Sequence, residues 1–194
     1  MDRNSKAAVV STVGYLCLGL VGWMFSMGAA AWFPKSYGLA ITYPLVFVLA
    51  VMGVLAFVVG RGLDSIVFFS GTALWGAACA GSVAVGADKT LFPSGYLGWF
   101  AIIWAIFFCY VWAGSFKSGV TRMLFLLGAC LTMMALAVGC WAHVSGFIVL
   151  GGYIGLATSI VAMIVSANEV IRPGTRSNLN LETTGTTAKP IAAD

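Results

Sequence analysis

Long apolar runs dominate the chain, and five stretches contain no Asp, Glu, Lys or Arg: 7–34, 36–60, 65–87, 90–116 and 123–168. A helix that crosses the hydrocarbon core of a bilayer needs about 20 mostly apolar residues. Each of the four shorter stretches therefore predicts one membrane-spanning helix, and the longest predicts two. The positions of charges, Gly and Pro place the six spans at 8–32, 39–59, 66–86, 95–116, 123–142 and 147–170.

This pattern predicts an all-α, polytopic membrane protein with one six-helix transmembrane domain over 1–171. The composition agrees, because 61% of the residues are hydrophobic and only 8% are charged, whereas soluble domains carry about 25% charged residues. A conventional water-soluble globule is therefore excluded. Residues 172–194 are polar and rich in Ser, Thr, Asn and Gly, so we expect them to form a disordered tail.

The basic residues divide unequally between the two predicted sides of the membrane. The side that carries both termini holds eight of them, and the other side holds only Lys35 and Lys89. Lys and Arg accumulate in cytoplasmic segments, so we expect both termini to be cytoplasmic. A bacterial cytoplasmic membrane is the expected location. The eight residues are Arg3, Lys6, Arg61, Lys117, Arg122, Arg172, Arg176 and Lys189.

Several function classes find no support in the sequence. The basic residues are scattered singly, which argues against a nucleic-acid partner. The five cysteines all fall within predicted spans and show no metal-ligand spacing, so we interpret them as packing residues and expect no metal site. No nucleotide-binding or catalytic motif is present, and a lone Ser, Thr or Cys without a base is inert. We therefore expect neither an enzyme nor a cofactor.

The last predicted span carries a stripe of small residues. At about 100° per residue, its members project within a narrow arc, and Glu169 continues the stripe at the cytoplasmic end. Two interpretations stay open: a packing seam of the kind that joins membrane helices, which we favour, or a pore-lining face. The stripe consists of Gly151, Gly155, Ser159, Ala162 and Ser166.

The titratable residues outside the spans give little indication of chemistry. His143, the single histidine, lies at the outer end of the fifth span. It could gate or relay protons, although a structural interfacial histidine is the favoured interpretation. We interpret Lys35, Asp64, Asp88 and Lys89 as solvated loop charges, so any pore is expected to have no fixed charge.

A pore without fixed charge favours small solutes, because burying even one charge at the bilayer centre costs at least about 2.5–3.5 kcal/mol. It can pass a weak acid in its neutral form, a proton-coupled anion, or an anion that meets helix N-termini and hydroxyl dipoles. The candidates for lining or gating such a pore are polar residues within or near the spans. They are Thr12, Thr72, Thr132, Ser159, Asn168 and Glu169.

Several motifs in the later spans resemble those of the acetate uptake transporter family, also called the succinate–acetate permease family. The similarity covers about residues 43–171 and implies a six-helix protein that forms a homohexamer with one pore per protomer. The matching segments are Gly95-Tyr96-Leu97-Gly98-Trp99, the aromatic run from Trp104 to Trp112, Gly114-Ser115-Phe116-Lys117-Ser118-Gly119, Gly152-Tyr153-Ile154-Gly155-Leu156, Ala167-Asn168-Glu169-Val170 and Ser70-Gly71-Thr72-Ala73-Leu74-Trp75.

The resemblance also points to a pore constriction. Tyr15 corresponds to the first-span aromatic residue of that constriction, Gly71 stands where the family has a third-span Tyr, and the leucine partner falls near Ala129–Leu131, with Leu131 as our candidate. The loss of one ring predicts a wider neck. The family's N-P-A-P-L-G-L motif is absent, since Lys6-Ala7-Ala8-Val9-Val10-Ser11-Thr12-Val13 occupies its place.

We therefore expect a membrane channel or proton-linked permease for acetate, succinate or another small organic acid, with a small carboxylate and protons as its partners. Two alternatives stay open. One is a six-helix channel for urea or short amides, which would also need a narrow uncharged pore. The other is a structural subunit of a larger membrane complex, which would make equal use of the small-residue faces.

Overall fold

The structure is a computed structural model that describes residues 3–32, 35–87, 94–116 and 118–171, without the side chains of 3–4, 35–41, 81–87 and 94. The described residues form six α-helices and no strand. The helices are α1 (Arg3–Ala29), α2 (Lys35–Val58), α3 (Gly62–Ala87), α4 (Ser94–Gly114), α5 (Val120–Ala142) and α6 (Ser145–Ile171). The predicted tail, 172–194, lies outside the described residues.

The predicted all-α fold with six helices is confirmed. Each observed helix begins before its predicted span, so that α3 begins at Gly62 and includes Asp64, and α5 includes Arg122. Five helices are long and apolar enough to cross a membrane. In α2 the apolar segment among the described side chains is the shorter Thr42–Val58, and Pro44 lies inside the helix without ending it.

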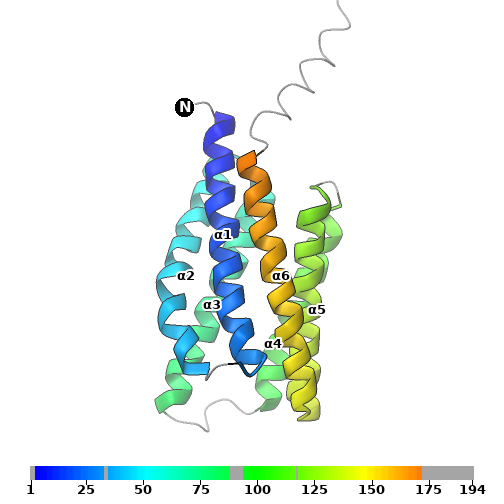
Figure 1. The fold of residues 1–194 in the computed structure, drawn as a ribbon. Coiled ribbons are helices and arrows are strands. Elements are labelled where there is room, and N and C mark those ends of the chain that lie inside the picture. Colours follow the sequence, from blue (N-terminus) through cyan, green and yellow to red (C-terminus); the bar gives the residue numbers. More distant parts are fainter. Residues whose placement is uncertain (1–2, 33–34, 88–93, 117, 172–194) are drawn as a thin grey trace, which may run out of the picture.

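The six helices run roughly parallel or antiparallel in one bundle, and each connection reverses the chain direction (Figure 1). The most extensive helix pairs follow the spatial order α3–α2–α1–α6–α5–α4. Because the number of helices is even, the start of α1 and the end of α6 lie at the same end of the bundle (Figure 1). We call this the terminal end; the charge bias predicts that it is cytoplasmic.

The predicted small-residue stripe of α6 packs against both α1 and α5. A Cβ atom on Gly22 of α1 would lie 2.7 Å from the hydroxyl of Ser159, and a Cβ atom on Gly151 would lie 3.1 Å from Leu136 of α5. Beside the stripe, a Cβ atom on Gly152 would meet the backbone of Ala29 and Ala30. Close approach of this kind needs residues with little or no side chain. The packing-seam interpretation therefore agrees with the structure, although Gly155 and Ser159 also line an internal cavity.

Large apolar side chains cover the outside of the bundle. Phe47, Phe57 and Tyr110 are each more than 70% exposed, and Ile103 and Ile106 are also largely exposed. Such a surface is unfavourable in water but suits the hydrocarbon of a bilayer, where it costs nothing to expose. The outer surface and the helix lengths together describe a multi-pass membrane protein.

Candidate functional site: an internal cavity and an ionic cluster

A cavity of about 50 Å³ lies inside the bundle, which is room for about three to five water molecules. Five of the six helices line it, with α2 excluded. Its walls are mainly apolar, with a few hydroxyl groups. The lining residues are Leu18, Gly22, Ser26, Val67, Gly71, Leu74, Trp75, Phe108, Phe125, Ala129, Thr132, Met133, Gly155, Thr158 and Ser159.

Three of the lining hydroxyls donate their proton to the backbone of their own helix. Thr132, Thr158 and Ser159 each donate to the backbone carbonyl four residues earlier in the same helix, at 2.8 Å. A hydroxyl that donates its proton in this way keeps its oxygen lone pairs as acceptors. In this arrangement these three groups can receive hydrogen bonds from a solute, as from a protonated carboxyl group.

The structure places the predicted pore residues unequally with respect to this cavity. Gly71, Thr132 and Ser159 line it. Thr72 is partly buried and donates to its own helix at the Phe68 carbonyl, 2.9 Å away. Thr12 is not among the lining residues. Its backbone carbonyl joins α1 to α6 by accepting a hydrogen bond from the Ser166 hydroxyl at 2.8 Å.

Two further candidates lie away from the cavity, near the ends of the bundle. Asn168 is half-buried in the last turns of α6. His143 is exposed and ends α5 in a left-handed conformation, with φ of 52°. This position agrees with the structural interpretation of His143 as a helix-ending residue.

Two residues of the constriction inferred from the family resemblance, Leu131 and Gly71, lie in different surroundings. Leu131 is 44% exposed on the outer surface of the bundle and is absent from the cavity wall, where α5 instead contributes Ala129, Thr132 and Met133. A Cβ atom on Gly71 would lie 2.6 Å from Leu18 Cδ2. The space that a ring at residue 71 would need is therefore partly taken by Leu18.

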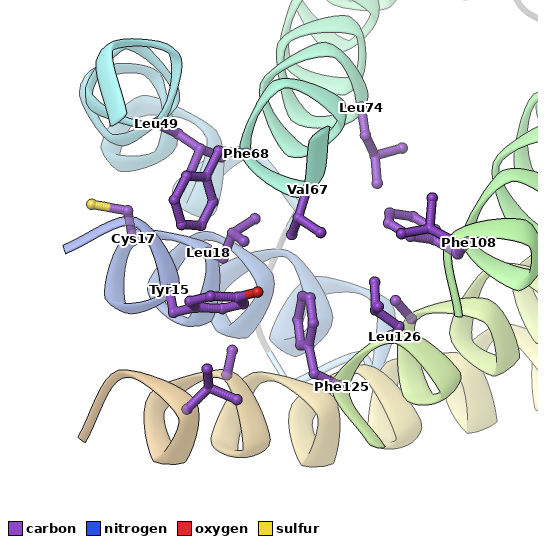
Figure 2. Close-up of a cluster of buried hydrophobic side chains, with 14 of the residues drawn as sticks. Tyr15, Cys17, Leu18, Leu49, Val67, Phe68, Leu74, Phe108, Phe125 and Leu126 are labelled. Carbon is purple, nitrogen blue, oxygen red and sulfur yellow. The ribbon is translucent and has the colours of Figure 1, made fainter. Parts of the chain in front are cut away.

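Tyr15 is almost completely buried, with 1% of its surface exposed. Its ring makes edge contacts with Phe68 and Phe125, with centroids 5.2 and 5.8 Å apart (Figure 2). Its hydroxyl donates to Asp64 Oδ1 at 3.1 Å. We call Tyr15, Phe68 and Phe125 the aromatic layer; Phe125 is also part of the cavity wall.

We predict that Tyr15→Ala widens the range of solutes that pass, because it removes the central ring of the aromatic layer. Tyr15→Phe should leave the size selectivity unchanged, since it keeps the ring and loses only the hydrogen bond to Asp64. Uptake of acetate, propionate and butyrate into proteoliposomes compares the three proteins. Equal size selectivity in wild type and Tyr15→Ala would show that this ring does not limit passage.

Next to the aromatic layer lies a partly buried ionic cluster of Arg61, Asp64, Arg122 and Glu169. The interpretation of Asp64 as a solvated loop charge is wrong, because its side chain is only 2% exposed. Its Oδ2 atom lies 2.8 Å from Arg61 Nε and 3.5 Å from Arg122 Nη2, and it accepts a hydrogen bond from Ser11 at 2.5 Å. The structure describes the side chain of neither Lys35 nor Asp88 nor Lys89.

Glu169 completes the cluster from α6. Its carboxylate accepts two hydrogen bonds from the Arg61 guanidinium, at 2.9 and 3.1 Å, and one from Arg122 at 2.5 Å. Burial by itself lowers the pKa of Arg61, but the hydrogen bonds to Glu169 and the charge of Asp64 outweigh it and raise the pKa above its usual value. Arg61 therefore remains a cation.

The ionic cluster lies at the terminal end of the cavity. On three helices, a residue of the cluster, or one that is hydrogen-bonded to it, lies three positions before a residue that lines the cavity. These pairs are Tyr15 and Leu18, Asp64 and Val67, and Arg122 and Phe125. Three helical residues span about 4.5 Å. The four charges of the cluster therefore lie close to this end of the cavity, whereas the sequence indicated no fixed charge near a pore.

No family model matches the chain, and no curated protein matches it in sequence. A solved structure, that of the bacterial acetate channel SatP, is similar to it with a TM-score of 0.77 and 19% sequence identity, over 94% of this chain and 98% of that chain. The fold is that of a bacterial acetate channel.

The acetate-channel fold agrees with the resemblance to the acetate uptake transporter family seen in the sequence motifs. At this level of identity the likeness establishes the architecture, which extends over nearly the full length of both chains. The cavity and the ionic cluster described above therefore lie within an acetate-channel fold.

Proposed function

We propose that this protein is a membrane channel or proton-linked permease for small organic acids of the acetate and succinate type. The observation that carries the proposal is the internal cavity, which lies inside a bundle with the fold of an acetate channel. We place the solute path along this cavity, between α1, α3, α4, α5 and α6. By the family resemblance we propose one such path in each protomer of a homohexamer in the bacterial cytoplasmic membrane.

The chemistry of the cavity favours the protonated acid as the species that passes its centre. The walls are largely apolar, so an anion would lose its hydration there without a counter-charge among the lining residues. The hydroxyls of Thr132 and Ser159 are oriented to accept hydrogen bonds. The O–H group of a neutral carboxylic acid supplies the matching donor.

The same acceptors would also suit the N–H groups of urea, which keeps a urea or short-amide channel as the second candidate. The decisive measurement is uptake of labelled acetate and labelled urea into proteoliposomes that contain the purified protein, at neutral and acidic external pH. We expect acetate uptake that rises under acidic conditions. Urea uptake with no acetate flux above empty liposomes would overturn the proposal in favour of the amide channel.

A pair of variants on α5 tests the proposed path. Ala129→Leu places a larger side chain in the cavity wall and is expected to lower acetate flux about tenfold or more, because the cavity holds only about 50 Å³. Leu131→Phe enlarges a side chain on the outer surface of the same helix and should leave the flux unchanged. Loss of flux in Leu131→Phe with normal flux in Ala129→Leu would place the path elsewhere.

A further inference from the structure

We propose that Arg61 and Arg122 form a carboxylate-binding site at the terminal end of the cavity, and that the Glu169 side chain occupies this site as a tethered competitor. The inference rests on the proposed function only in naming the solute, a small carboxylate anion. It assigns the ionic cluster a role in binding in addition to its contribution to helix packing.

The geometry around Glu169 is that of a bound carboxylate. Arg61 holds both carboxylate oxygens through its two terminal nitrogens, at 2.9 and 3.1 Å, and Arg122 adds a third hydrogen bond to one of them. This two-pronged arrangement is the strong form of arginine–carboxylate recognition. Acetate presents the same head group, with a methyl group in place of the Glu169 Cγ atom.

The two carboxylates of the cluster differ in exposure. Asp64 is 2% exposed and has additional donors in Ser11 and Tyr15, so it is a fixed part of the site. Glu169 is 20% exposed and belongs to the last turn of α6, which ends at Ile171. Helix ends open locally at low free-energy cost, so the Glu169 side chain can leave while Asp64 remains.

Exchange of Glu169 for a solute keeps the arginines paired. The released Glu169 carboxylate moves into water, and the entering anion takes over the hydrogen bonds to Arg61 and Arg122. The exchange avoids the cost of leaving a buried cation without a counter-ion. The solute then stands beside the aromatic layer, directly before the cavity.

A binding measurement on the purified full-length protein in detergent tests this inference without any transport. The dissociation constant for sodium acetate is obtained from the broadening of its methyl proton resonance. We expect Glu169→Gln to bind acetate at least about tenfold more tightly than wild type, because a tethered competitor acts at an effective concentration in the millimolar range. Adding Arg122→Gln to Glu169→Gln should abolish this gain.

Two further variants keep the result interpretable. Lys6→Gln removes an exposed basic residue at the same end and should leave acetate affinity unchanged, which separates the site from a general field effect. Glu169→Asp keeps the charge but withdraws the carboxylate by one methylene, so it should give an intermediate gain even if Glu169→Gln folds poorly. Unchanged acetate affinity in both Glu169 variants would overturn the inference.

The binding result and the transport result are independent. Acetate flux in wild type with no gain in affinity in the Glu169 variants would overturn the binding site and leave the proposed function standing. Tighter acetate binding in Glu169→Gln with no acetate flux in wild type would support the binding site and overturn the proposed function.

Discussion

Replacing Asp64 with asparagine is expected to destabilise the protein by about 3–5 kcal/mol, the usual cost of removing one partner from a buried ionic group. Asparagine keeps the shape of the side chain, but Arg61 and Arg122 are then left with Glu169 as the single remaining carboxylate of the ionic cluster. The measurement is equilibrium unfolding in mixed detergent micelles, followed by tryptophan fluorescence.

The matched control for Asp64→Asn is the charge-balanced double variant Asp64→Asn with Arg122→Gln. Because the double variant again contains equal numbers of cations and anions in the cluster, it should lose less stability than the sum of its two single variants. Stabilities that add would show that Asp64 and Arg122 act independently. A wild-type free energy of unfolding in Asp64→Asn would show that the cluster does not hold α3 and α5 together.

The second large effect is expected at the α1–α6 seam, where Gly152→Ala should destabilise the protein by about 1–3 kcal/mol or more. The added Cβ atom would lie 2.8 Å from Ala29 C and Ala30 Cα and closer still to Ala30 N. These are backbone atoms, which cannot rotate away as a side chain would. The two helices must therefore separate or shift, which loses packing along the whole seam.

Gly146→Ala is the control on the same helix, because its Cβ atom would meet only Val144 Cγ1 at 3.9 Å. It should be neutral or slightly stabilising, since alanine is a better helix former than glycine. The same unfolding measurement applies to both variants. Equal stability of Gly152→Ala and Gly146→Ala would contradict the close approach of α6 to the end of α1.

Much of the fold can be predicted from sequence because apolar length is a local property. The span predicted at 95–116 differs from Ser94–Gly114 by no more than two residues at either end, and the span predicted at 123–142 differs from Val120–Ala142 only at its start. The largest errors fall at the starts of spans, where a charge was taken as the boundary. Asp64 and Arg122 belong to helices because they are paired inside the protein.

The ionic cluster could not be predicted because its members are far apart in the sequence. Arg61 and Glu169 are separated by 108 positions, and nothing in the pattern around either residue indicates the other. A single charged residue is expected in a loop, where water solvates it. Two cations and two anions at one level of the bundle instead neutralise one another. The stripe that ends in Glu169 was the available signal, since it directed this carboxylate toward the helix interface.

Three of the predicted pore residues, Gly71, Thr132 and Ser159, line the cavity. Thr132 and Ser159 are polar residues on the inner faces of long apolar helices, and this contrast is visible in the sequence. Leu131 projects from α5 in another direction than Ala129 and Thr132. Which of these directions faces the interior depends on how α5 packs against α4 and α6. An apolar residue in a membrane helix suits either the interior or the lipid, so its type alone does not decide its direction.

The ionic cluster also determines how this end of the protein responds to voltage. One elementary charge moved across a membrane potential of 100 mV changes in energy by about 2.3 kcal/mol, but two arginines and two carboxylates carry no net charge. A rearrangement that moves the cluster as a unit is therefore insensitive to the electric field. Glu169→Gln leaves one uncompensated positive charge, and the same movement then becomes voltage-dependent.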